Sequence, residues 1–151
     1  MMTEGNAVFI DTNILVYANL ALSPFHAQAV ERLQTLDNRG IDLWISRQVL
    51  REYLSAMTRP GDLTGQIPIA SLAADISYFT DYFHIAEDSS EVTGRLLSLI
   101  EQIPTGGRQI HDANLVATMQ LYGIQNFLTH NIADFDRFSQ VITVLPLIET
   151  A

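Results

Sequence analysis

The stretch AVFIDTNILVYA, residues 7 to 18, indicates the fold. Its first part, Ala7 to Ile10, is a short apolar run typical of a buried strand, and the apolar residues after it recur at helical spacing. Between the two lie Asp11, Thr12 and Asn13, and an ionised carboxylate is costly to bury there without partners. A strand that passes into a helix at an Asp predicts either a helix cap or a binding residue at the end of the strand.

The rest of the chain alternates segments of the same two kinds. Short apolar runs predict further strands at Leu43 to Ile45, Phe83 to Ala86, Asn126 to Thr129 and Val141 to Leu145. Helices are predicted from Ser23 to Gly40, after a cap at Ser46, from Ile69, after a cap at Asp88 or Ser89, and from Asp112 to Tyr122, with an exposed loop over 60–68. Helices between short strands predict an α/β fold, a three-layer sandwich with a five-stranded, mainly parallel central sheet.

Composition bounds the class of protein. At 151 residues we expect one domain over 1–151, with its core at about 7–145. No apolar run approaches the ~20 residues that span a bilayer, and the start has neither the basic flank nor the apolar stretch of a signal peptide. There is no cysteine. These features predict a soluble, cytoplasmic protein that does not associate with membranes.

Charge excludes several mechanisms. The chain has 8 Lys plus Arg against 17 Asp plus Glu, a net charge of −9, and all of its cationic residues are Arg. The absence of Lys excludes a Schiff base and a P-loop phosphate site. A negative chain does not bind nucleic acid through bulk charge, so a nucleic-acid substrate requires clustered Arg or a metal ion.

Four carboxylates fall where one edge of the predicted sheet would collect them. Asp11 and Asp134 come after strands, Asp112 opens a helix on its inward face, and Glu52 lies within the helix after the second strand. Ligands bind at the carboxyl ends of parallel strands. Each residue alone also has a structural explanation: Asp11 as a helix cap, Asp112 through the helix dipole, Glu52 as a partner of Arg51 or Arg47, and Asp134, like Asn131 and Asp136, as a loop or cap residue.

Converging carboxylates repel one another, and some of them protonate unless a cation is present. Oxygen ligands suit Mg²⁺ or Mn²⁺. No cysteine and only four scattered histidines argue against zinc, although His111 is next to Asp112. The sequence therefore predicts a Mg²⁺ or Mn²⁺ site.

These motifs resemble those of the PIN domain family, specifically the small VapC-type toxins of prokaryotic toxin–antitoxin pairs. The similarity rests on DTN at 11–13, on Glu52, on HDANLVA at 111–117 and on THNIADF at 129–135, within residues 7–145. Each motif is short, and their order and spacing give them their specificity. The resemblance implies a five-stranded parallel sheet and a Mg²⁺- or Mn²⁺-dependent endoribonuclease, usually a homodimer, that a cognate antitoxin neutralises.

Carried over by position, the resemblance also implies roles for individual residues. Asp11, Glu52, Asp112 and Asp134 would form the catalytic and metal-binding set, with Asn13, Thr129 and Asn131 orienting ligands or water. Asn131 stands where some members have Asp, and Asp136 competes with Asp134 for the fourth position. In the metal-dependent mechanism, a bound water attacks the phosphodiester and no side-chain nucleophile is required; one or two ions fit the sequence equally.

Four arginines near the same edge are candidates for substrate phosphate contacts: Arg47, Arg51, Arg59 and Arg108. Alternatively, Arg47 and Arg51 pair with nearby acids. An antitoxin could bind a groove formed by the apolar helices around 20–29 and 50–57, which could equally belong to the core or to a dimer interface.

Two other functions compete. A phosphatase of the haloacid dehalogenase type uses an Asp after the first strand, but it would also need a second Asp at position 13 and a Lys, and this chain has Asn13 and no Lys. A PIN-like binding module that has lost catalysis and acts through a protein partner is the other alternative.

Overall fold

In the computed structural model, which describes residues 6–61 and 67–148, five parallel strands form one sheet. The strands are β1 (Ala7–Ile10), β2 (Asp42–Ser46), β3 (His84–Ala86), β4 (Asn126–Thr129) and β5 (Thr143–Pro146). Their order across the sheet is β3-β2-β1-β4-β5, and every neighbouring pair is parallel. The predicted α/β class with a five-stranded sheet is confirmed.

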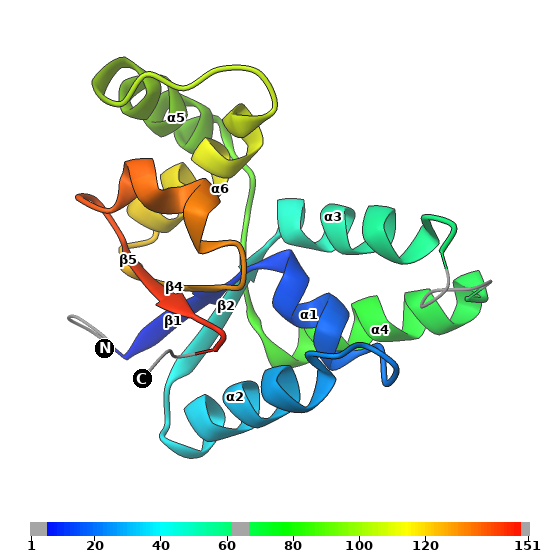
Figure 1. Cartoon of the computed structure of the whole chain (residues 1–151). Helices are drawn as coiled ribbons and strands as arrows, with labels where there is room; N and C mark the ends of the chain where they lie inside the picture. Colours follow the sequence, from blue (N-terminus) through cyan, green and yellow to red (C-terminus); the bar gives the residue numbers. More distant parts are fainter. Residues whose placement is uncertain (1–5, 62–66, 149–151) are drawn as a thin grey trace.

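Helices cover both faces of this sheet (Figure 1). They are α1 (Thr12–Ala18), α2 (His26–Asn38), α3 (Arg47–Thr58), α4 (Ile69–Tyr82), α5 (Ser90–Gln102), α6 (Gln109–Leu121) and the short 3₁₀ helix η1 (Ile132–Phe138). The first four lie on one side of the sheet, and α5, α6 and η1 lie on the other. The result is the predicted three-layer sandwich.

The strand order reverses direction between β1 and β4. From β1 the chain moves outward through β2 to β3, and it then returns across the sheet to β4 and continues outward to β5. Open parallel sheets bind ligands at such a switch point, at the carboxyl ends of the two strands. Asp11 directly follows β1, and Thr129 is the last residue of β4.

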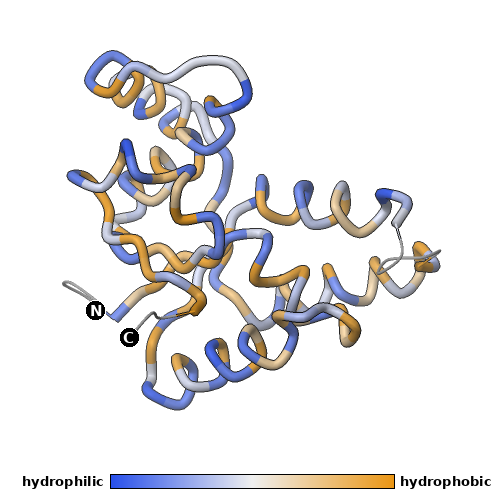
Figure 2. Tube along the Cα trace, in the orientation of Figure 1, coloured by the Kyte–Doolittle hydropathy of each residue, from blue (hydrophilic) through white to orange (hydrophobic). Residues whose placement is uncertain are grey.

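The core is formed by the central strands and the helix faces that pack on them. Phe9 and Phe127 are fully buried on neighbouring strands, with ring centroids 5.9 Å apart. The ring of Phe135 of η1 packs edge-on against that of Phe127, with the ring centroids 4.6 Å apart. The apolar runs of β1 and β4 stand out in Figure 2. These strands are apolar on both faces because helices cover both.

Several predicted boundaries differ from the observed ones. The helix predicted from Ser23 begins at His26, because the Ser23 hydroxyl accepts a hydrogen bond from the Phe25 N–H within a tight turn and does not cap the helix. Helix α6 begins at Gln109, before Asp112. Strand β5 extends through Pro146, which is tolerated because β5 is an edge strand and its outer side has no strand partner there.

Other corrections concern faces and loops. Within the apolar helix around 50–57, Leu54 is exposed, while Leu50 and Met57 are in the core. The last two residues therefore do not supply a surface groove. Residues 132–138, expected to be loop and cap residues, form η1, which buries Phe135 and Phe138. Within the loop predicted over 60–68, residues 62–66 lie outside the described residues.

Across residues 6–61 and 67–148, no helix has both the length and the apolar character that crossing a membrane requires.

Candidate functional site

A pocket of about 350 Å³ opens at the carboxyl ends of β1 and β4, and four carboxylates line it. Its walls come from α1, α3, α6 and the segment after β4. We call it the acidic pocket, and its lining residues are Asp11, Thr12, Asn13, Val16, Tyr17, Glu52, Ala56, Arg59, Asp112, Asn131, Asp134 and Phe135. The structure thus brings together the four acids that the sequence singled out, from four separate segments of the chain.

Asp11 is the most buried of these acids, at 6% exposure. It caps α1: its Oδ1 accepts a hydrogen bond of 2.8 Å from the Thr12 N–H. Its Oδ2 accepts bonds from the Thr129 hydroxyl at 2.7 Å and from Asn13 Nδ2 at 3.2 Å. Burial nevertheless raises the pKa of Asp11 to about 7, and these hydrogen bonds only partly oppose the shift. Asp11 is therefore both a cap and a pocket residue.

The three predicted supporting residues form one hydrogen-bonded group around Asp11. The Thr129 hydroxyl, which donates to Asp11, accepts bonds from Asn13 Nδ2 at 3.3 Å and from the Asn131 N–H at 3.0 Å. Asn13 Oδ1 also accepts from the His130 N–H at 3.3 Å. This group fixes the direction of the Asp11 carboxylate relative to both central strands.

Glu52 does not pair with an arginine. Its Oε1 accepts a 3.0 Å bond from the Thr12 hydroxyl, and its Oε2 accepts a 2.9 Å bond from Gln48 Nε2. Both carboxylate oxygens are held by neutral donors, so the negative charge of Glu52 is not compensated by these contacts. The alternative of a pair with Arg51 or Arg47 is wrong, because both arginines contact other acids.

Asp112 and Asp134 complete the acidic lining from the opposite side of the sheet. Asp112 lies in the first turn of α6, and burial together with the charges of Asp134 and Glu52 raises its pKa to about 6. Asp134, in the first turn of η1, is exposed. Asp136 is on the same short helix but lines a different pocket, next to β5. The geometry therefore favours Asp134 over Asp136 as the fourth acid.

Of the four arginines predicted to contact phosphate, one lines the acidic pocket and three do not. Arg47 forms an ion pair with Glu87, through two hydrogen bonds of 3.0 Å, and Arg51 pairs with Asp88 at 3.4 Å. Arg108 precedes α6 and is not among the pocket residues. Arg59, which directly follows α3, lines the acidic pocket.

The donor chemistry of this pocket fits a hard divalent cation. All four ionisable groups that would bind an ion are carboxylates, and burial, together with the charges of neighbouring acids, raises the pKa values of Asp11 and Asp112. Among the described residues, no three His, Cys, Asp or Glu side chains surround one point as metal ligands would. Mg²⁺ commonly binds through one or two carboxylates and fills its remaining positions with water, so two acids suffice.

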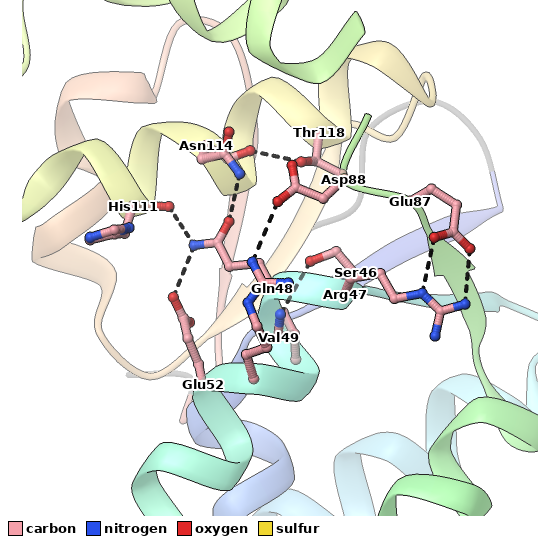
Figure 3. A network of polar contacts seen from close by, with 11 residues as sticks. Ser46, Arg47, Gln48, Val49, Glu52, Glu87, Asp88, His111, Asn114 and Thr118 are labelled. Carbon is pink, nitrogen blue, oxygen red and sulfur yellow. Dashed lines mark hydrogen bonds and ion pairs between the residues drawn. The ribbon is translucent and has the colours of Figure 1, made fainter. Parts of the chain in front are cut away.

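Two further residues contact the acids of the pocket but were not predicted from the sequence. No role in the site was predicted for Thr12, but its hydroxyl donates to Glu52. Gln48 was not singled out, yet it is buried and contacts Glu52 and α6 (Figure 3). A polar residue near the start of a helix is usually solvated, but this one bonds to His111 and Asn114 of α6.

The fold and the pocket define a class: parallel α/β domains with a cluster of acidic side chains at the switch point of the sheet. The chain belongs to the PIN domain family, whose model matches residues 8–141. The resemblance to this family is therefore confirmed. A curated relative, Ribonuclease VapC48 of Mycobacterium tuberculosis, is 27% identical over 136 residues, which cover 87% of this chain and 91% of that protein.

Solved structures share the fold at low sequence identity. The VapBC2 structure from Rickettsia felis, bound to a DNA fragment from its promoter, aligns with a TM-score of 0.66 and 20% identity over 93% of this chain and 98% of that chain. VapC20 of Mycobacterium tuberculosis, described as a Sarcin-Ricin loop cleaving toxin, aligns with a TM-score of 0.66 and 16% identity over 90% and 96% of the two chains.

Proposed function

We propose that this protein is a Mg²⁺- or Mn²⁺-dependent endoribonuclease and the toxin of a type II toxin–antitoxin pair. The observation that carries the proposal is the acidic pocket itself: Asp11, Glu52, Asp112 and Asp134 converge at the switch point of the sheet. Membership of the PIN family and similarity to a relative named as a ribonuclease support it.

In this mechanism the carboxylates of Asp11 and Asp112 would hold the cation, because both are partly or fully buried and line the acidic pocket from opposite sides of the sheet. A bound divalent cation supplies an activated water and counter-charge for the phosphate. Glu52 and Asp134, on the walls of the pocket, orient that water and the remaining ligands. Asn13 and Thr129 keep the Asp11 carboxylate pointed into the pocket through their hydrogen bonds.

The RNA backbone would enter past Arg59, the one candidate arginine that lines the pocket among the four considered. Its guanidinium supplies positive charge to a phosphate in a pocket that is otherwise acidic. Arg47 and Arg51, which contact Glu87 and Asp88, contribute less to binding.

The biological context is part of the same proposal. A cognate antitoxin protein neutralises the ribonuclease, the protein assembles as a homodimer, and both act in the cytoplasm. The solved neighbours include a VapBC2 structure, which supports a protein partner of this kind.

A catalytically inactive PIN-like binding module remains the alternative function. The retention of all four acids in one pocket favours the enzyme. The haloacid dehalogenase alternative is inconsistent with the match to the PIN family, and position 13 carries an Asn that binds the Asp11 carboxylate where that mechanism needs a second acid.

The test is cleavage of a mixed RNA pool by purified protein with Mg²⁺ or Mn²⁺, with and without EDTA. We expect cleavage that EDTA abolishes and that Asp11→Asn and Asp112→Asn each lower at least about 100-fold, since each removes a charged ligand. Asp136→Asn, outside the pocket, is the matched control. Cleavage that survives EDTA, or that is equal in the wild type and both pocket variants, would contradict the proposal.

Toxicity on expression is the second readout, because an antitoxin that copurifies would mask cleavage. The ribonuclease model expects growth arrest that Asp11→Asn relieves. Growth arrest that persists in Asp11→Asn, with no cleavage by the wild type, would instead support the binding module.

A further inference from the structure

A buried amide side chain joins two helices that carry acids of the pocket. Gln48, the second residue of α3, is 5% exposed. Its Nε2 donates to Glu52 Oε2 at 2.9 Å and to the His111 carbonyl oxygen at 2.8 Å, and its Oε1 accepts from Asn114 Nδ2 at 2.8 Å (Figure 3). Both amide hydrogens are used, so the cost of burying the group is offset.

The orientation of this amide is dictated by its neighbours. On one side it faces a carboxylate and a backbone carbonyl, which only accept, and on the other side it faces the NH₂ group of Asn114. Rotating the Gln48 amide by half a turn would place its oxygen against two acceptors. The side chain therefore has one arrangement that satisfies every partner.

The arrangement restrains Glu52 from both sides. Thr12 of α1 holds one carboxylate oxygen and Gln48, one turn earlier on α3, holds the other, so both oxygens of the carboxylate are restrained. Both donors are neutral. A Lys or Arg in place of Gln48 would hold Glu52 equally well but would cancel the negative charge that a cation needs.

The same amide restrains Asp112. The carbonyl that accepts from Gln48 belongs to His111, the residue directly before Asp112, in the first turn of α6. Glu52 and Asp112 both line the acidic pocket, so their like charges repel. The Gln48 amide links the Glu52 side chain to the first turn of α6, which carries Asp112.

We propose that Gln48 is a positioning residue of the acidic pocket: it holds the Glu52 carboxylate and the first turn of α6 so that Glu52 and Asp112 both face the bound cation. The inference rests on the proposed metal-dependent function of this site. Gln48 does not line the pocket, so it acts through Glu52 and Asp112 and not on the substrate.

The test compares Gln48→Met, which keeps the length of the side chain and removes its hydrogen bonds, with Tyr53→Phe. Tyr53 lies on the same helix α3, and its hydroxyl donates a 2.7 Å bond to Asp75 of α4, away from the acidic pocket. Each variant removes polar contacts from α3, but only the first touches Glu52. The readouts are Mn²⁺ affinity by titration calorimetry without RNA, RNA cleavage with Mn²⁺, and thermal unfolding by circular dichroism.

We expect Gln48→Met to weaken Mn²⁺ binding and to slow cleavage by about 10- to 100-fold, as is typical when a partner of a metal ligand is removed. Tyr53→Phe should leave the Mn²⁺ affinity and the cleavage rate unchanged. Equal Mn²⁺ affinity in the wild type and Gln48→Met would overturn the proposal, and so would an equal loss in Tyr53→Phe. If Gln48→Met does not fold, Asn114→Ala, which removes only the far partner of the amide, is measured in its place, with an expected loss of about 3- to 10-fold.

A double variant tests the route through Glu52. When Glu52→Ala is already present, adding Gln48→Met should weaken Mn²⁺ binding by much less than it does in the wild type, because its main partner is gone. If the two substitutions reduce Mn²⁺ affinity by independent factors that simply multiply, that route is contradicted.

The failure of this proposal can be told apart from the failure of the ribonuclease proposal. If the wild type binds Mn²⁺ and Gln48→Met weakens binding, but neither cleaves RNA, the positioning role stands and the ribonuclease proposal fails. If the wild type cleaves RNA and Gln48→Met matches it in every readout, the reverse holds.

Discussion

The Thr129 hydroxyl donates a 2.7 Å hydrogen bond to Asp11 Oδ2, joining the ends of the two central strands. Thr129 is fully buried and also accepts bonds from Asn13 and from the Asn131 backbone. One hydroxyl therefore sets the direction of the central carboxylate and satisfies two further polar groups at the switch point.

Thr129→Val keeps the shape of the side chain and removes all of these bonds. We expect a loss of about 1–3 kcal/mol in the free energy of unfolding, because buried donors and the Asp11 carboxylate lose their partner. The Thr129 bond lowers the pKa of Asp11, so its removal also raises that pKa further. Urea unfolding measures the change in the free energy of unfolding. Thr80→Val, an exposed site on α4, is the control and should change the unfolding free energy by less than about 0.5 kcal/mol. An equal loss at both sites would contradict this reading.

The metal-free protein should lose stability as the pH rises. In the folded state the pKa of Asp11 is raised to about 7 and that of Asp112 to about 6, while both are near 3.8 in the unfolded chain. Between these values the folded state binds more protons than the unfolded state, so the free energy of unfolding falls from about pH 4 to pH 7. Thermal unfolding in EDTA from pH 4 to pH 7 shows whether the stability falls or rises with pH. Asp11→Asn should flatten the decline, and a stability that rises with pH through this window would refute the assignment.

A divalent cation should reverse that loss. At pH 7.5 the carboxylates must ionise at a cost, and binding of Mn²⁺ to the folded state alone offsets it. At a free concentration ten times the dissociation constant, the expected gain is about 1.4 kcal/mol. Differential scanning calorimetry with and without Mn²⁺ measures the gain, which Asp11→Asn should abolish and Asp136→Asn should retain. A gain of the same size in Asp11→Asn would place the ion elsewhere.

Arg59 and Arg47 should differ in their effect on RNA binding. Arg59→Gln removes a positive charge from the pocket, so we expect RNA affinity to fall about 10-fold and its dependence on salt concentration to weaken by about one ion. Arg47→Gln should change neither the RNA affinity nor its salt dependence, because Arg47 does not line the acidic pocket and its guanidinium contacts Glu87. Fluorescence anisotropy with a labelled RNA at several salt concentrations separates the two. A larger effect from Arg47 would move the RNA path to the other side of α3.

Asp134 and Asp136 provide the sharpest comparison within one short helix. Asp134 lines the acidic pocket and raises the pKa of Asp112, whereas Asp136 lines the pocket beside β5. We expect Asp134→Asn to slow RNA cleavage at least about 10-fold and to move the titration of Asp112, followed by NMR, to lower pH. Asp136→Asn should do neither. The opposite pattern would exchange the roles of the two residues.

The periodicity of the sequence predicted the class of the fold well, because buried parallel strands and amphipathic helices leave plain patterns. Ala7 to Ile10 and Asn126 to Thr129 have the bounds that the sequence predicted. Helix ends were less accurate: Ser23 suits a cap, but its hydroxyl bonds within a turn and α2 starts at His26. Such choices depend on local tertiary contacts that propensity does not encode.

The acids of the pocket could be predicted because a carboxylate at the end of a buried strand, or on the inward face of a helix, conflicts with its surroundings. Gln48 could not be predicted in the same way. Its role depends on His111 and Asn114, more than sixty residues further along the chain, and no local pattern marks that pairing. The sequence likewise does not identify Glu87 as the partner of Arg47, because the two residues lie 40 positions apart in the chain.

The strand order has a consequence for how the protein is made. Asp11 and Glu52 leave the ribosome early, but β4 must insert beside β1 before Thr129 can bind Asp11, and Asp134 comes later still. A nascent chain that ends before β4 contains three of the five strands, and the edge of β1 that pairs with β4 has no partner. The acidic pocket is therefore complete only after β4 and η1, in the last part of the domain, have been synthesised.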